Sequence, residues 1–259
     1  MPSSSINQLG LDLRPRANAR PKANFEQSVA GSSLRRVETK GFLFAEGDPV
    51  THVFRVETGA IALYKVLADG RRQIMDFAYP SDFIGLGARG EHVMNAQAVK
   101  PTRLRCLPVG TLRQHASSDP MISFRLYEAL AAELAASRDH TLTICRHTAL
   151  ERVVGFLLVC SRRNEQKRKD PRRIDLPMTR VDIGDFLDLT TETVSRTFTK
   201  LRTLRLIELP CPHQVKLVNI EELETLAAGE MKVVGRRREP NAMRQDQRRN
   251  APQRCVLGT

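Results

Sequence analysis

The strongest constraint on the fold is residues 178–209, MTRVDIGDFLDLTTETVSRTFTKLRTLRLIEL, where two short helical patterns are separated by three residues. We predict helices over 180–187 and 191–203, joined by the turn Asp188–Leu189–Thr190. The apolar residues of each pattern share one helical face: Ile183, Phe186 and Leu187 in the first helix, and Val194, Phe198 and Leu201 in the second. Two helices joined by such a short turn are typical of a helix-turn-helix.

The second of these helices presents a polar face that suits base recognition. In a helix-turn-helix, the N-terminal residues of the second helix reach base edges in the major groove. Arg196 can donate to O6 and N7 of a guanine, and Glu192 can accept from N4 of a cytosine. Ser195 is small enough to lie close to a base edge. An ordinary ion pair between Glu192 and Arg196 at i,i+4 is the alternative. We predict that all three residues contact bases.

Phosphate contacts are predicted around the same helix. The hydroxyl of Thr190 can cap the helix, and the helix N-terminus favours a nearby anion. Such contacts set the register on DNA rather than the sequence preference. The candidates are Arg180, Thr190, Thr191, Lys200 and Arg202.

A long helical region precedes this motif. Residues 121–160 contain no proline, and no glycine before Gly155. Asp119 or Ser118 can cap the start, with Pro120 at the first helical position. We predict one helix over 119–146 and a second from about His147 to Cys160. An apolar stripe this long is most simply buried against a second copy of the chain; packing on the preceding domain alone is the alternative. The stripe consists of Ile122, Leu126, Leu130, Leu134, Thr141 and Cys145.

Short apolar or alternating runs punctuated by glycines fill residues 31–118 and predict an antiparallel β-roll. The pair Asp69-Gly70 between two such runs is a hairpin signal. After the helix-turn-helix, RLIELP and HQVKLVNI read as two wing strands, and EELETLAAG reads as a short helix. The predicted fold is α+β: an N-terminal antiparallel β-roll, a long dimerisation helix and a C-terminal winged helix-turn-helix over 147–230.

Charge and composition narrow the functional class. The net charge is +12, but residues 1–36 contribute +4 and residues 231–259 contribute +6. We interpret 1–30 as a flexible tail and 231–259 as a disordered basic tail that adds non-specific phosphate attraction. No apolar run approaches the ~20 residues of a membrane span, and no secretory signal is evident, so we expect a cytoplasmic protein with no membrane partner.

The sequence indicates no enzyme, cofactor or metal site. The five cysteines form no CxxC pair and the six histidines show no ligand spacing, so we expect no metal. No nucleophilic triad, catalytic carboxylate pair or glycine-rich phosphate loop is present. His92 is the least implausible haem ligand for a gas sensor. The charged segment 161–176 is interpreted as a solvated loop.

The segment 178–207 resembles the DNA-binding motif of the CRP/FNR superfamily of bacterial regulators. ETVSR at 192–196 resembles the FNR and FixK branch, in which a Glu-x-x-Ser-Arg pattern reads the half-site TTGAT; the CRP branch has Gly where Ser195 stands and Arg where Thr191 stands. HTALERVVGFLLVCSRR resembles the helix that leads into this domain, and ETGAIALYKVLADGRRQIMDFAYPSDFIGLGA resembles the cyclic-nucleotide-binding-like roll of the family. The resemblance covers roughly residues 32–228.

Departures from the family pattern point to its FixK-like members. FNR itself holds an iron–sulfur cluster on four cysteines, whereas no cysteine precedes Cys106 here, and one thiolate cannot hold a cluster. CRP binds cAMP through a Glu and an Arg-Ser pair, whereas Phe83 stands near the Glu position and no Arg-Ser occurs. Asp188 occupies a turn position that is usually Gly.

The resemblance implies a homodimeric transcription activator that binds a TTGAT-N4-ATCAA palindrome and contacts RNA polymerase. The implied polymerase-facing surfaces are the 164–173 and 87–92 loops, and the implied targets are microaerobic or anaerobic, denitrification or nitrogen-fixation genes. Two alternatives stay open. One is a regulator gated by a small effector or haem in the roll. The other is a cyclic-nucleotide-type protein-interaction module with a degenerate DNA domain.

Overall fold

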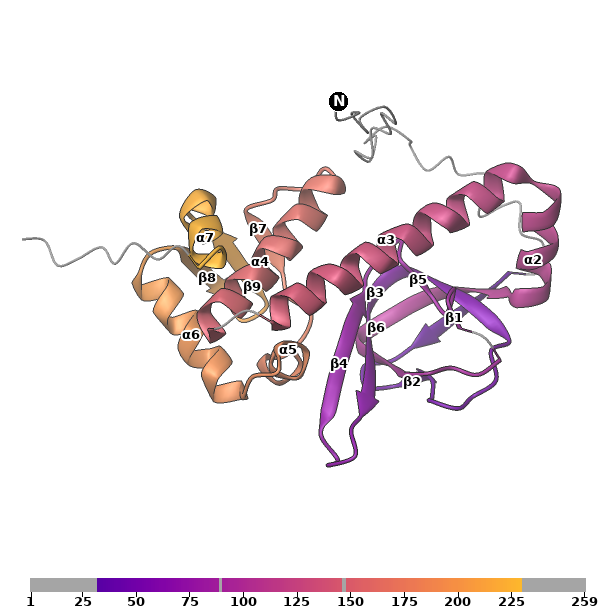
Figure 1. The fold of residues 1–259 in the computed structure, drawn as a ribbon, viewed down its shortest axis with the longest axis horizontal. Coiled ribbons are helices and arrows are strands. Elements are labelled where there is room, and N and C mark those ends of the chain that lie inside the picture. The colour runs from indigo at the N-terminus through magenta and orange to yellow at the C-terminus, as the bar shows by residue number, and fades with distance from the viewer. Residues whose placement is uncertain (1–31, 89, 146–147, 230–259) are drawn as a thin grey trace, which may run out of the picture.

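The computed structural model describes residues 32–88, 90–145 and 148–229. A β-roll and a helical C-terminal half lie side by side, and helix α3 runs along the roll toward the C-terminal half (Figure 1). The two predicted tails, 1–30 and 231–259, lie outside the described residues. The predicted order of roll, long helix and winged helix-turn-helix is confirmed.

The roll is a six-stranded antiparallel sheet with the order β1-β6-β3-β4, in which β2 also pairs with β6 and β5 with β3. Its strands are β1 (Ser33–Val37), β2 (Phe42–Phe44), β3 (His52–Val66), β4 (Arg72–Ala78), β5 (Phe83–Ile84) and β6 (Asn95–Pro108). Gly59 is required within β3, because a Cβ there would lie 2.2 Å from Oγ1 of Thr102 on β6. The two long strands can therefore approach closely.

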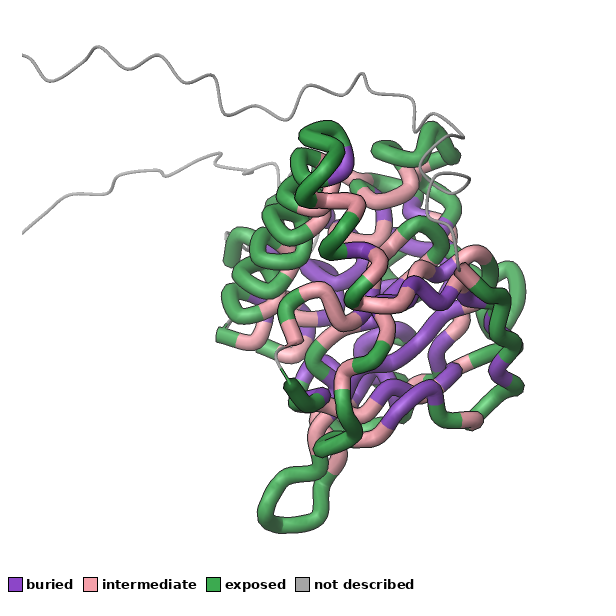
Figure 2. Tube along the Cα trace, turned by 90° about the vertical axis from the view of Figure 1, so that its right-hand side faces the viewer, coloured by how far each residue is buried: buried purple, intermediate pink, exposed green. Residues whose placement is uncertain are grey.

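The predicted hairpin at Asp69-Gly70 joins β3 to β4. Val66 pairs with Arg72, and Gly70 has a φ of 83°, which glycine adopts without a steric penalty. The tip is exposed and projects away from the body of the molecule (Figure 2). The strand that follows it, β4, faces the C-terminal half.

The helical connection begins earlier than the sequence indicated. Residues 31–118 were predicted to form the β-roll, but the last strand, β6, ends at Pro108 and helix α2 spans Val109–Ser118. Helix α3 follows over Pro120–Ile144, with the predicted cap: Oδ1 of Asp119 accepts from the Met121 N–H at 2.8 Å. The backbone turn at Asp119 therefore separates two helices rather than a strand and a helix.

Helix α4 spans Ala149–Gln166, so the predicted helix end at Cys160 is wrong and the first residues of the predicted loop are helical. Ser161 is buried and its hydroxyl donates to the carbonyl of Pro171 at 2.7 Å, so the helix continues along a packed surface. The rest of the segment is not simply a solvated loop either, because strand β7 (Arg173–Asp175) pairs with a wing strand and buries Ile174.

The C-terminal helix-turn-helix matches the predicted bounds. Helix α5 spans Arg180–Leu187 and helix α6 spans Thr191–Thr203. The wing is a three-stranded sheet in the order β7-β9-β8, followed by a short helix. These last elements are β8 (Ile207–Cys211), β9 (Gln214–Leu217) and α7 (Ile220–Ala227).

One hydrophobic core crosses from the roll into the helix-turn-helix. Phe77 of β4 is 1% exposed and its ring lies 5.2 Å from that of Phe186 on α5, which also contacts Phe156 of α4. Ala62, Tyr64 and Ile74 of the roll belong to this core, whereas the interior of the roll has a separate core. The C-terminal half is therefore packed directly on β4 rather than tethered by a linker.

Candidate nucleic-acid interface

Helix α6 separates an apolar face from a polar face. Val194, Phe198 and Leu201 are at most 2% exposed and pack into the core. Glu192, Ser195 and Arg196 lie exposed. The predicted amphipathic pattern is confirmed, and it leaves the three candidate base-contact residues on the outer surface.

The candidate base-contact residues are brought together at the N-terminal end of α6. Oε1 of Glu192 accepts a hydrogen bond from the guanidinium of Arg196, and both side chains are more than two-thirds exposed. An exposed pair of this kind adds about 0.3–0.5 kcal/mol to stability. It holds the two side chains side by side, and both remain free to exchange this contact for base edges.

The start of α6 is capped as predicted. Oγ1 of Thr190 accepts from the Thr193 N–H at 3.2 Å, and the hydroxyls of the two threonines lie 2.8 Å apart. This first turn lies at the end of the helix that carries partial positive charge. This end of the helix is therefore suited to a phosphate.

The phosphate candidates differ in how they are held. Thr191, Lys200 and Arg202 are exposed on α6. Arg180 is half-buried, and its guanidinium lies over the ring of Phe198, 3.5 Å from the centroid. Burial lowers the pKa of Arg180. Its side chain is thus fixed against α6, at the N-terminus of α5.

The turn between α5 and α6 places Asp188 in a backbone conformation that favours glycine. Asp188 has φ 52° and ψ 53°, the left-handed conformation in which Gly is more common. The Leu189 N–H donates to the Gly184 carbonyl at 3.0 Å. From α4, Arg152 donates to the carbonyls of Leu187 and Asp188 at 3.1 and 3.3 Å. Sequence reasoning missed Arg152, since nothing local links it to this turn.

The proposed dimer stripe on α3 divides between two faces. Ile122 is buried within the protomer, and Leu126 packs on the patch formed by Val53, Leu107 and Leu112. These two residues face the roll, so they do not belong to an exposed surface. Leu130, Leu134, Thr141 and Cys145 are exposed.

Other apolar residues of α3 are exposed and were missed from the sequence. They are Phe124, Tyr127 and Leu142, which are 55–67% exposed. Together with Leu130 and Leu134 they form a stripe along the helix, which we call the α3 outer stripe. A four-residue spacing fits either face of a helix, and only packing on the roll distinguishes the two.

The residues weighed for cofactors have packing roles in this structure. The His92 ring stacks on Phe44 in the roll, with centroids 3.5 Å apart. Cys106 is buried in the roll beside Ser33, and burial raises the pKa of its thiol. Across the described ranges, no three His, Cys, Asp or Glu side chains are grouped in a way that could hold a metal ion.

The fold and this surface define a class: a DNA-binding regulator with a winged helix-turn-helix packed on a sensor-type roll. The comparisons with known proteins agree. Residues 34–119 match the model of the cyclic nucleotide-binding domain, and residues 151–226 match that of the Crp-like helix-turn-helix domain. The chain belongs to the CRP/FNR family of transcription regulators.

Individual relatives place the chain among the FixK-like members of that family. It is 37% identical over 186 residues to the nitrogen fixation regulation protein FixK of Bradyrhizobium diazoefficiens, covering 72% of this chain and 78% of the relative. It is 31% identical to the transcriptional activator protein anr of Pseudomonas aeruginosa, over 78% of this chain and 82% of the relative. The solved structure of FixK2 from Bradyrhizobium japonicum matches with a TM-score of 0.70 and 36% identity, covering 75% of this chain and 96% of that one.

Within the parts of the chain that the structure describes, no helix is both long enough and apolar enough to cross a bilayer.

Proposed function

We propose that this regulator binds a TTGAT-N4-ATCAA palindrome as a homodimer, with α6 of each protomer in the major groove. The observation that carries the proposal is the joint exposure of Glu192, Ser195 and Arg196 at the N-terminal end of α6. Arg196 reads a guanine, Glu192 a cytosine, and Ser195 lies against a neighbouring base edge. The proposed phosphate contacts are Arg180, Thr190, Thr191, Lys200 and Arg202.

The second copy packs along the α3 outer stripe. A 25-residue helix is about 37 Å long. Its exposed large side chains would be buried against the same stripe on α3 of the second copy. With a two-fold axis along α3, the two copies of α6 would enter successive major grooves, about 34 Å apart. Residues Thr141 and Cys145 extend this proposed interface toward the end of α3.

The genes controlled follow from the relatives. Two of them are named for nitrogen fixation regulation and for transcriptional activation. We extend this to activation of nitrogen-fixation, denitrification or other microaerobic and anaerobic genes. RNA polymerase is the proposed protein partner, and the 164–173 and 87–92 segments are its proposed contacts. In the first of these, Lys169, Arg172 and Arg173 are exposed.

The test is a gel-shift titration of purified, aerobic, ligand-free protein at stated salt, with the palindrome and a scrambled copy as probes. We expect selective binding by the wild type. Arg196→Ala should cost about 1–3 kcal/mol on the palindrome and relax the preference at one base pair. Lys200→Ala is the matched control on the same helix: it should weaken binding to both probes equally.

Other results would redirect the assignment. If Arg196→Ala loses affinity equally on both probes, Arg196 contacts phosphate rather than a base. Weak, unselective wild-type binding would favour a regulator that needs a small effector or haem in the roll. A stable dimer that binds no palindrome would favour a protein-interaction module.

A further inference from the structure

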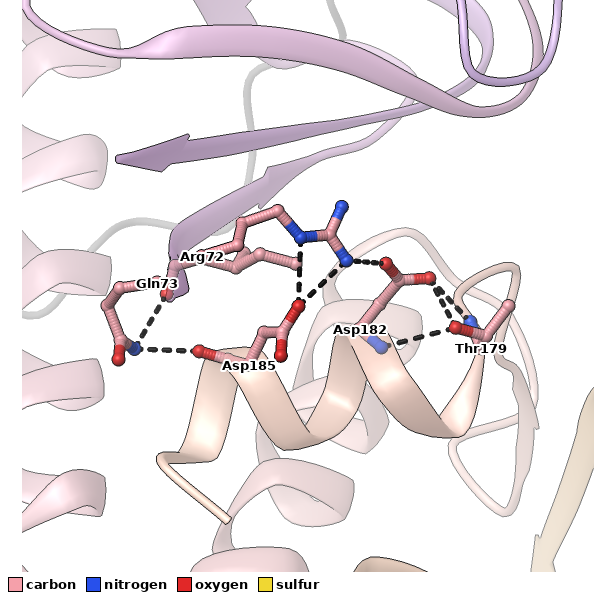
Figure 3. A network of polar contacts seen from close by, with 6 residues as sticks. Arg72, Gln73, Thr179, Asp182 and Asp185 are labelled. Carbon is pink, nitrogen blue, oxygen red and sulfur yellow. Dashed lines mark hydrogen bonds and ion pairs between the residues drawn. The ribbon is translucent and has the colours of Figure 1, made fainter. Parts of the chain in front are cut away.

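Arg72 links the roll to the first helix of the helix-turn-helix. It is the first residue of β4, just after the hairpin tip. Its Nη2 lies 2.5 Å from Oδ1 of Asp182 and 2.8 Å from Oδ2 of Asp185, and its Nε donates to the same Asp185 oxygen at 2.8 Å. One planar guanidinium thus bridges two carboxylates on successive turns of α5 (Figure 3).

The neighbours of Arg72 extend this contact along α5. The Gln73 side-chain amide donates to the backbone carbonyl of Asp185 at 2.7 Å. At the hairpin tip, Nη1 of Arg71 lies 3.7 Å from Oδ1 of Asp188, in the turn that leads to α6. Asp182, Asp185 and Asp188 recur every three residues, so one acidic edge faces Arg71, Arg72 and Gln73. We call this set of contacts the hairpin clamp.

The Arg72 contacts of the hairpin clamp are better protected from water than the contact between Arg71 and Asp188, whose side chains are 67% and 54% exposed. The side chains of Arg72, Asp182 and Asp185 are 27%, 12% and 25% exposed. Burial opposes the charge on Arg72, but its hydrogen bonds to both carboxylates outweigh this, so the pKa of Arg72 is raised. Its guanidinium also lies 5.4 Å from the centre of the Tyr64 ring. Partly buried, multidentate arginine contacts fix geometry as well as adding energy.

Asp182 connects the hairpin clamp to the start of α5. Its Oδ2 accepts from the N–H and the hydroxyl of Thr179, while the Asp182 N–H donates back to the Thr179 hydroxyl (Figure 3). The same carboxylate therefore caps α5 and anchors it to β4. Since α5 contacts α6 directly, the direction of β4 is transmitted to the recognition helix.

The hairpin clamp leaves the base-contact surface free. Arg72 engages α5, whereas Glu192, Ser195 and Arg196 remain exposed on α6. In helix-turn-helix proteins the first helix crosses the DNA backbone, where three aspartates would repel phosphate. Arg72 offsets two of these charges. The arrangement therefore suits a DNA-competent orientation rather than a blocked one.

We propose that Arg72 is a positioning residue for DNA recognition, which through α5 sets the orientation of α6 relative to the roll and hence the spacing between the two recognition helices of the dimer. This inference rests on the proposed binding of a spaced palindrome. Its specific consequence is that the hairpin clamp controls discrimination between spacers. A residue that served only stability would not control that property.

The test compares full-length wild type with Arg72→Gln on palindromes with spacers of three, four, five and six base pairs. We expect Arg72→Gln to lose about tenfold in affinity on the four-base-pair spacer, a typical coupling between linked elements, and to lose most of the preference for that spacer. Arg72→Glu combined with Asp185→Arg should restore both. Arg103→Gln is the matched control, because it removes an exposed arginine that pairs with Glu57 elsewhere on the roll.

A second measurement reports on the hairpin clamp without DNA. Amide hydrogen exchange should quicken in the hairpin and α5 of Arg72→Gln, while α7 and the circular dichroism spectrum stay unchanged. If the wild type selects one spacer and Arg72→Gln keeps the same affinity and selectivity, the positioning role is wrong. If the wild type binds no palindrome, the proposed function fails and the positioning role with it, whatever the exchange data show of the contact itself.

Discussion

Replacing Gly184 by alanine sets helix propensity against tertiary packing. Gly184 lies inside α5, where alanine is favoured over glycine by about 1 kcal/mol. A Cβ at this position would, however, lie 2.6 Å from the carbonyl oxygen of Leu189 in the turn and 3.6 Å from the backbone nitrogen of Thr191. Both neighbours are backbone atoms, so no side-chain rotation can relieve the contact.

The expected magnitude follows from these two effects. The turn must open by about 0.7 Å to reach the ~3.3 Å of a close C···O contact. Overpacking of this kind costs about 1–3 kcal/mol, so after the propensity gain we expect Gly184→Ala to lose about 1 kcal/mol of unfolding free energy. Because the turn positions α6, affinity for the palindrome should fall as well.

Urea unfolding of the full chain and a gel-shift titration measure the two effects. Gly110→Ala is the matched control, since a Cβ at Gly110 in α2 meets nothing within 4 Å. That variant should gain about 0.4–1 kcal/mol without changing DNA binding. A gain for Gly184→Ala equal to that of Gly110→Ala, with unchanged affinity, would refute the argument from the turn.

Two further predictions concern α3. Leu134→Glu places a charge in the middle of the α3 outer stripe. Because Leu134 is 52% exposed in the single chain, the variant should fold but sediment as a monomer. An unchanged dimer would rule out this interface. The His140 ring stacks on Phe186 with centroids 4.0 Å apart, and among the described residues its two ring nitrogens have no hydrogen-bond partner. Burial lowers the pKa of His140 to about 4. Below pH ~6.5 the unfolded chain therefore binds a proton at this residue that the folded chain does not bind, and the free energy of unfolding falls as the pH drops toward 4. His140→Phe should remove about 1 kcal/mol of the stability lost between pH 7.5 and 5.5, as measured by urea unfolding at both pH values; an equal loss in both proteins would show that His140 is not protected from protonation.

The long helices show where sequence reasoning succeeds and where it fails. The start of α3 was predictable because Asp119 and Pro120 act within one turn. The end of α4 was not, because the buried Ser161 is stabilised by a carbonyl ten residues away, across a segment that reads as a charged loop. Strand β7 was missed for the same reason, since its only signal is pairing with β9.

The sequence by itself determined the helix-turn-helix and the exposed polar face of its second helix. Threonine caps, apolar spacing and the i,i+4 pair of Glu192 and Arg196 all act within a few residues, so they can be read locally. Only the tertiary structure decided which face of α3 is left exposed, and that Arg72 meets Asp182 more than a hundred residues later. The first outcome depends on how α3 packs on the roll, and the second on how β4 packs against the C-terminal half. No local periodicity encodes the contact between two distant surfaces.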